Sequence, residues 1–364
     1  MKSEAELKNL LATITPTEKS FSLATQKNWD LLAHPPGSLG HLETMCCKLA
    51  SIQKTETPQA KKKCVCVFAA DNGVFAEGVT SQPQITTFHL AESMLRGNTG
   101  LGAVSQFAKS DIFIYDVGLI KTSEFPEIKN LKLHNGTNNI STNEAMSRAD
   151  CVTLILRGIE TAKEIFTAKG YALAGVGELG ICNTTTSAAV LSALSEKSAS
   201  ETVGSGASTT TEMRRKKIAA VDKALKINVP NANDPIDCLA KVGGFDLAAM
   251  CGFFLGAAIY HGAAVIDGFI STVAALCAYR LNAQVKDYLF ASHASNEKSG
   301  KLAAELLGLK PVLDLEMRLG EGSGCPLLFT LMDASLFIFY HMGKFTDTPI
   351  AKSDLIDLRT GKHS

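Results

Sequence analysis

Five short apolar segments recur along the chain, and each one ends at a glycine, an acidic residue or a serine. They span 64–70, 112–115, 171–176, 263–266 and 288–290. Near-continuous apolar runs of this length are typical of strands buried on both faces. Longer helical patterns separate them, for example at 246–260 and 326–342. The alternation predicts an α/β fold with a doubly wound, mainly parallel sheet and helices on both faces.

Polar residues follow the predicted strands at their carboxyl ends. Asp71, Asp116, Glu178, Asp267 and Ser292 all stand at or just beyond such an end. In doubly wound sheets, ligands bind beyond the carboxyl ends of the strands. Any one of these residues could merely turn the chain, but five together favour a binding edge.

The pattern of secondary structure divides the chain into a small helical part and a large part in which strands and helices alternate. Residues 1–60 contain two helical patterns, 4–14 and 45–53, separated by the breaker sequence at 35–38. We expect a small helical domain over 1–60, joined by part of the polar C-terminal tail, 344–364. Residues 61–343 are expected to form a Rossmann-like α/β catalytic domain.

Composition narrows the classes of function. The chain has 36 Lys and Arg against 36 Asp and Glu, and this zero net charge argues against a nucleic-acid partner. The longest uncharged stretch, 247–266, is rich in Gly and Ala and is interpreted as a buried helix and strand, not a membrane span. No secretory signal is visible, and the ten cysteines lack zinc spacing. Free buried thiols in a reducing cytoplasm fit this pattern best.

Three glycine-rich segments are candidates for anion binding: 175–180, 203–206 and 320–324. The first matches G-x-G-x-x-G, which alone is a weak indication of a dinucleotide site, and no Walker lysine is present. In the third, Glu321 stands between two glycines and before an apolar helix, where a carboxyl group can gain a raised pKa and act as a general base. The alternative is that Glu321 caps the helix beginning near Cys325.

An ordered set of motifs covers nearly the whole chain. These motifs occupy 35–43, 70–74, 96–100, 145–148, 175–185, 242–246, 267–269, 292–293 and 318–324. In this order they resemble the nicotinate-nucleotide–dimethylbenzimidazole phosphoribosyltransferase family, which activates the lower ligand of cobalamin.

The resemblance implies a transfer of phosphoribose from nicotinate mononucleotide to a benzimidazole-type base. The nicotinate leaves as a neutral ring and needs no general acid, whereas the incoming base must lose a proton. Glu321 matches the family's general base, and Glu178 matches a second active-site carboxylate. No metal or other cofactor is implied.

Further site residues follow from the same resemblance. The expected nucleotide and phosphate contacts are Gly177, Gly180, Asn183, Gly204, Gly206, Lys217, Asp267, Ser292, Leu319 and Gly320. The expected base pocket contains Gln82, Phe88, Leu90 and Leu179. Typical members carry a serine and a glutamine where this chain has Gln82 and Leu90, which leaves open whether the acceptor is dimethylbenzimidazole, another benzimidazole, adenine or a phenol.

Two other functions stay open at the level of sequence. An NAD-dependent oxidoreductase would rest on the glycines of 175–180. A non-catalytic binding subunit is the other alternative, since some relatives work as paired subunits, but Glu321 argues against it. The family implies a homodimer, or a heterodimer with a paralogue.

Overall fold

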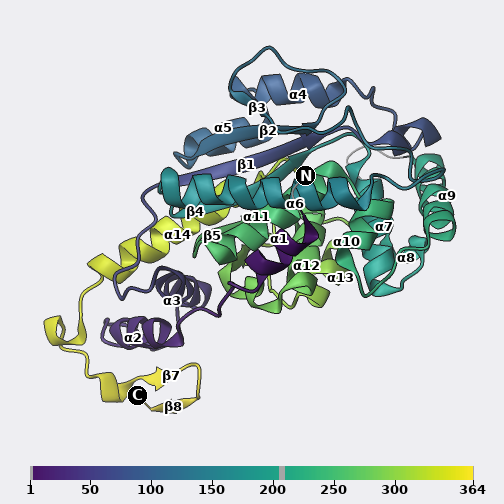
Figure 1. Ribbon diagram of the computed structural model, residues 1–364. Coiled ribbons are helices and arrows are strands. Elements are labelled where there is room, and N and C mark those ends of the chain that lie inside the picture. The colour runs from purple at the N-terminus through teal and green to yellow at the C-terminus, as the bar shows by residue number, and fades with distance from the viewer. Residues whose placement is uncertain (1–2, 205–209, 364) are drawn as a thin grey trace.

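A six-stranded parallel sheet forms the centre of the molecule (Figure 1). The computed structural model describes residues 3–204 and 210–363. The strands lie in the order β3-β2-β1-β4-β5-β6, the order of dinucleotide-binding Rossmann sheets. Their bounds are β1 (Lys63–Ala70), β2 (Asp111–Gly118), β3 (Ile128–Asn130), β4 (Leu173–Leu179), β5 (Ala263–Ile266) and β6 (Leu289–Ala291).

Helices cover both faces of this sheet, as expected from the sequence. On one face α11 packs on β2, β1, β4 and β5, α12 packs on β4 and β5, and α6 packs on α11. On the other face α14 packs on β1, β4 and β5, beside α4 and α5. The six helices are α4 (Thr86–Leu95), α5 (Gly100–Phe107), α6 (Arg148–Lys163), α11 (Phe245–Ile259), α12 (Phe269–Leu281) and α14 (Gly324–His341). The α/β prediction is confirmed.

The remaining elements are mostly short and lie in the connections. The β4–β5 connection contains α7 (Asn183–Ser195), α8 (Ala199–Thr202), α9 (Thr211–Asn228) and α10 (Pro235–Val242), and α13 (Gly300–Leu307) follows β6. Single-turn or irregular helices occupy Gly73–Glu77, Glu164–Ala168, Ala283–Tyr288, Phe345–Asp347 and Lys352–Asp354.

The uncharged stretch at 247–266 forms most of α11, a tight turn and β5, and it is buried, as predicted, except at residues 259–261 around the turn. Among the described residues, α14 is the one helix long and apolar enough to cross a membrane. Because α14 packs on three strands of the sheet, its apolar composition is that of a helix facing a protein core.

Three strand predictions differ from the structure. Strand β2 continues past Tyr115 to Gly118, so that Asp116 lies within it. Strand β3 was missed because it has only three residues at the sheet edge and no apolar run. Strand β4 continues past Val176 to Leu179, so that Glu178 lies within the strand and not after it. The glycines at 175 and 177 are therefore strand residues and not a phosphate-binding turn, which removes the basis of the NAD interpretation.

The N-terminal helices are α1 (Glu4–Leu11), α2 (Lys19–Trp29) and α3 (His41–Gln53). Helix α1 packs on α6 and α11, whereas α2 and α3 pack on each other and α3 contacts α14. The C-terminal hairpin, β7 (Ile356–Asp357) and β8 (Lys362–His363), lies near α2 (Figure 1). An ion pair of 3.0 Å joins Arg359 to Asp30, the residue after α2. The division into two domains stays a prediction.

Candidate active site

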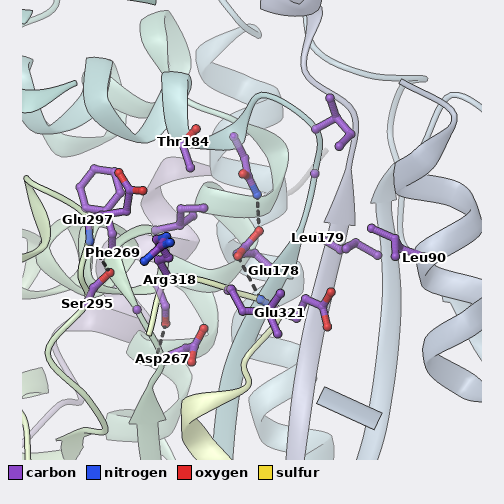
Figure 2. A pocket seen from close by; sticks show the side chains of 18 of the residues that line it. Leu90, Glu178, Leu179, Thr184, Asp267, Phe269, Ser295, Glu297, Arg318 and Glu321 are labelled. Carbon is purple, nitrogen blue, oxygen red and sulfur yellow. Dashed lines mark hydrogen bonds between the residues drawn. The ribbon is translucent and has the colours of Figure 1, made fainter. Parts of the chain in front are cut away.

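A pocket lies at the carboxyl ends of β4 and β5 (Figure 2), beside the point where the strand order reverses between β1 and β4. This is the position where doubly wound sheets bind ligands. Its walls come from α4, the end of β4, the start of α7, the first turn of α12, and the segments that follow β6 and precede α14. The lining residues are Gln82, Thr87, Leu90, Glu178, Leu179, Gly180, Ile181, Asn183, Thr184, Asp267, Gly268, Phe269, Ile270, Ser271, His293, Ser295, Glu297, Arg318, Leu319, Gly320 and Glu321.

The loop that carries Glu321 has an unusual backbone. Gly320, Glu321 and Gly322 have φ values of 82°, 65° and 90°, all in the left-handed region. Glycine adopts this region freely, but a glutamate held there is strained by about 1–3 kcal/mol. Such strain persists only where surrounding contacts hold it, and it commonly marks a functional residue.

Gly177 explains how this loop can approach the sheet. A Cβ atom at Gly177 would lie 2.5 Å from the Glu321 carbonyl oxygen and 2.8 Å from the Gly322 Cα. Gly177 is thus beneath the loop and does not line the pocket. The structure gives it a packing role and does not place it as a nucleotide contact.

The side chain of Glu321 is buried at the pocket wall, with the residue only 8% exposed. Burial raises the pKa of its carboxyl group, against the lowering effect of the Leu101 N–H, which donates to Oε2 over 3.3 Å. The carboxylate therefore faces the start of α5. The alternative that Glu321 caps its own helix is wrong: the Gly324 N–H, at the start of α14, donates to Asp267 instead.

Glu178 is another of the three buried glutamates that line the pocket in the described part of the chain, the third being Glu297. Burial, with the nearby charges of Asp246 and Asp267, raises the pKa of Glu178 to about 8. The Asn183 side-chain amide donates to Glu178 and, over 3.3 Å, to Asp246. The Glu321 N–H donates to Glu178 Oε1 over 3.3 Å, which ties the two glutamates together.

The pocket has an apolar end. Leu90 and Leu179 lie on one side of Glu178 and Glu321 (Figure 2). Thr87 and Ile181 also line the pocket, and the Ile181 N–H donates to the Thr87 hydroxyl over 3.0 Å. Phe88 does not line the pocket; it is buried and its ring packs against the Lys121 ammonium group at 4.3 Å. Thr87 and Leu90 are three residues apart on α4 and share a face, which excludes Phe88 from that face.

The opposite end is polar. Phe269, Ser295 and Glu297 lie on the other side of the glutamates (Figure 2). Gly268 and the first turn of α12 also line this end, and the first N–H groups of a helix have no partners within it and attract anions.

Lys217 stands behind this polar end. It is buried and donates to the Thr184 hydroxyl over 3.0 Å, and Thr184 itself lines the pocket. Burial lowers the pKa of Lys217, whereas the charge of Glu297 raises it. Gly204 also lies close to Glu297, since a Cβ atom there would be 2.0 Å from the Glu297 Oε2. Gly206 lies outside the described residues.

Most of the expected site residues thus meet in one pocket. Ten line it: Gln82, Leu90, Glu178, Leu179, Gly180, Asn183, Asp267, Leu319, Gly320 and Glu321. Ser292 does not line the pocket; its buried hydroxyl donates to the Asp267 carbonyl over 3.2 Å, and the neighbouring His293 lines the wall.

Sequence reasoning missed several lining residues. Thr184, Phe269 and Arg318 lie within recognised motifs but had no assigned role, and Thr87, Ser295 and Glu297 had no motif at all. Only the helical spacing of Thr87 and Leu90 could have indicated one of these from the sequence.

The fold and the pocket define a Rossmann-like α/β enzyme in which the buried Glu178 and Glu321 lie between an apolar and a polar end of the pocket. A family model described as phosphoribosyltransferase matches residues 14–350. The chain belongs to the nicotinate-nucleotide–dimethylbenzimidazole phosphoribosyltransferase family, as the following relatives of that name show.

The curated relative from Clostridium tetani is 41% identical over 354 residues, which cover 97% of this chain and 98% of the relative. The relative from Escherichia coli is 40% identical over 351 residues, covering 96% and 97% of the two chains. Two solved structures from Thermus thermophilus are also similar, one described by the same enzyme name and one as CobT. Their TM-scores are 0.84 and 0.86 at 33% identity, over 91% and 92% of this chain and 98% and 99% of theirs.

Proposed function

We propose that this chain transfers the phosphoribosyl group of nicotinate mononucleotide to a benzimidazole-type or other aromatic base. The products are an α-ribazole 5′-phosphate and nicotinate, for the lower ligand of cobamides. One observation carries the proposal: Glu321 stands at the wall of a pocket that is apolar at one end and anion-attracting at the other.

The polar end supports binding of the nucleotide phosphate. The first turn of α12 offers backbone N–H groups, and Lys217 with Thr184 adds a cation and a hydroxyl group. Gly180, Asn183 and Gly320 are proposed ribose or phosphate contacts. Asp267 was expected to be another, but both of its carboxylate oxygens accept N–H groups of the 320–324 loop. The proposed set of nucleotide contacts also includes Gly204, Gly206, Ser292 and Leu319.

The apolar end supports stacking of a flat acceptor base between Leu90 and Leu179, with Gln82 at its edge. A ring nitrogen of the acceptor attacks C1′ of the ribose from the face opposite the pyridinium. The C1′–N bond to nicotinate breaks, and its electron pair neutralises the departing ring. This displacement inverts C1′ and yields the α anomer.

Glu321 takes the proton from the other nitrogen of the acceptor, which would otherwise stay cationic. The raised pKa of its carboxyl group makes Glu321 a stronger base than an exposed glutamate. Glu178, with a pKa of about 8, is largely protonated at neutral pH before the substrates bind. Its proposed role is to contact the nucleotide next to the ribose. The positive charge of the bound pyridinium would favour ionisation of Glu178, and the carboxylate would then stabilise the charge that develops on the ribose.

The direct test mixes the purified chain with nicotinate mononucleotide and a panel of bases, and identifies the products by mass. We expect free nicotinate and a ribazole phosphate, with the α configuration shown by NMR. A panel that liberates no nicotinate above the level of Glu321→Gln would overturn the proposal.

The cellular location and the oligomeric state belong to the same proposal. The chain is proposed to act in the cytoplasm as a homodimer, or with a paralogous subunit. Light scattering of the purified chain tests the first arrangement, and a monomeric mass with full activity would exclude both.

A further inference from the structure

We propose that Asp267 is a positioning residue, whose carboxylate holds the backbone of the 320–324 loop and thereby places Glu321 for proton transfer. This inference rests on the proposed function, because it names how the general base of that reaction is held in place.

The contacts of Asp267 lie on the loop itself. Asp267 follows β5 directly and is 3% exposed. Its Oδ2 accepts the Gly322 N–H over 3.1 Å, and its Oδ1 accepts the Gly324 N–H over 2.7 Å. One carboxylate therefore holds the loop at two points immediately after Glu321.

These two bonds hold a conformation that needs external support. Residues 320–322 all have positive φ, and a non-glycine residue in this region is strained. With the bond from the Glu321 N–H to Glu178, the buried carboxyl groups of Asp267 and Glu178 accept three N–H groups of this loop. Gly324 also begins α14, where a negative charge is favourable because the helix start carries a partial positive charge.

Asp267 is in turn fixed by its surroundings. The Ser292 hydroxyl donates to the Asp267 carbonyl, and the oxygen of that hydroxyl lies 3.0 Å from Nδ1 of His293. That Nδ1 is 3.8 Å from Asp267 Oδ1. Because Asp267 is itself held in place, its hydrogen bonds can keep the loop in one position. A catalytic group needs such support to stay in its productive geometry.

The charge of Asp267 also acts on its neighbours. The titratable groups that face it are Glu178 on β4, Glu321 on the loop, His293 after β6 and Cys325 on α14. Its charge raises the pKa of both Glu178 and Glu321. Removal of that charge should lower the pKa of the general base as well as loosen the loop.

The test compares Asp267→Asn with the matched control Asp116→Asn. Asp116 was expected on the binding edge, but it does not line the pocket. It is likewise buried near the end of a strand, and its Oδ1 accepts two backbone N–H groups, those of Gly118 and Leu119. Its Oδ2 pairs with Lys132 over 3.2 Å, so Asp116→Asn also controls for the loss of a buried negative charge. An asparagine at 267 keeps one oxygen and turns its NH₂ group toward the other loop N–H.

For Asp267→Asn we expect kcat to fall about 10- to 100-fold while the Kd of nicotinate mononucleotide changes less than about threefold. The acidic limb of the pH–rate profile should move to lower pH. The control should keep its profile. A kcat within threefold of the wild type, an unshifted limb, or a tenfold weaker Kd with kcat retained would each overturn the inference.

Hydrogen exchange separates this inference from the proposed function. The amides of Gly322 and Gly324 should be protected in the wild type and exchange faster in Asp267→Asn but not in Asp116→Asn. If the wild type liberates no nicotinate, the proposed function fails, yet this exchange still decides the positioning role. If Asp267→Asn does not fold, unprotected amides in the wild type would still refute it.

Discussion

The substitution Gly177→Ala adds a single methyl group beneath the loop of the general base. The new Cβ would lie 2.5 Å from the Glu321 carbonyl oxygen, and its three nearest neighbours are all backbone atoms of Glu321 and Gly322. No flexible side-chain end can give way. The backbone must retreat by about 0.9 Å to reach ordinary contact at 3.4 Å.

Two magnitudes follow from this displacement. Overpacking of a buried contact costs roughly 1–3 kcal/mol of unfolding free energy. A shift of about 1 Å in a catalytic group can lower the rate about 100-fold. We therefore expect Gly177→Ala to fold with a lower Tm and to lose about 10- to 100-fold in kcat.

The assay follows nicotinate release at saturating nucleotide and acceptor, with Tm measured on the same preparations. Gly343→Ala serves as the control, because a Cβ there meets nothing within 4 Å and the φ of Gly343 is not in the left-handed region. Wild-type kcat in Gly177→Ala would refute the view that this contact sets the position of Glu321.

Three further substitutions test the site. Glu321→Gln should lose about 10²- to 10⁴-fold in kcat while nucleotide binding, measured by calorimetry, persists; near-normal turnover would exclude the general-base role. In the folded protein Glu178 keeps its proton up to about pH 8, whereas in the unfolded chain it loses that proton near pH 4.5. Its contribution to the free energy of unfolding therefore falls as pH rises between these two values. The Tm of ligand-free Glu178→Gln should therefore fall less than that of the wild type from acid to pH 8, and parallel curves would contradict the raised pKa. Leu90→Gln should raise kcat/KM for a benzimidazole relative to a phenol by about fivefold, the value of one added hydrogen bond; an unchanged ratio would show that Leu90 does not contact the acceptor.

Local pattern was sufficient for the parts of the fold that are buried on both faces. The run at 64–70 and the stretch at 247–266 were assigned correctly because an apolar segment of that length must be buried. The local pattern did not predict β3 or the last residues of β4. Those residues are strands because of their hydrogen bonds to the neighbouring strands β2 and β1. Phe88 was misplaced for a related reason: bulk and proximity in sequence do not say which face of α4 meets the pocket.

By itself, the sequence determined the alternation of strands and helices, the order of the motifs, and the identity of Glu321 as an acid between two glycines, because these are properties of neighbouring residues. Only the tertiary structure decided that Gly177 underlies Glu321, that Asp267 accepts the loop amides, and that the pKa of Glu178 is raised to about 8. Contacts between residues far apart in the chain depend on how the sheet edge brings them together. A pKa depends on the burial and the charges found there, which no local pattern specifies.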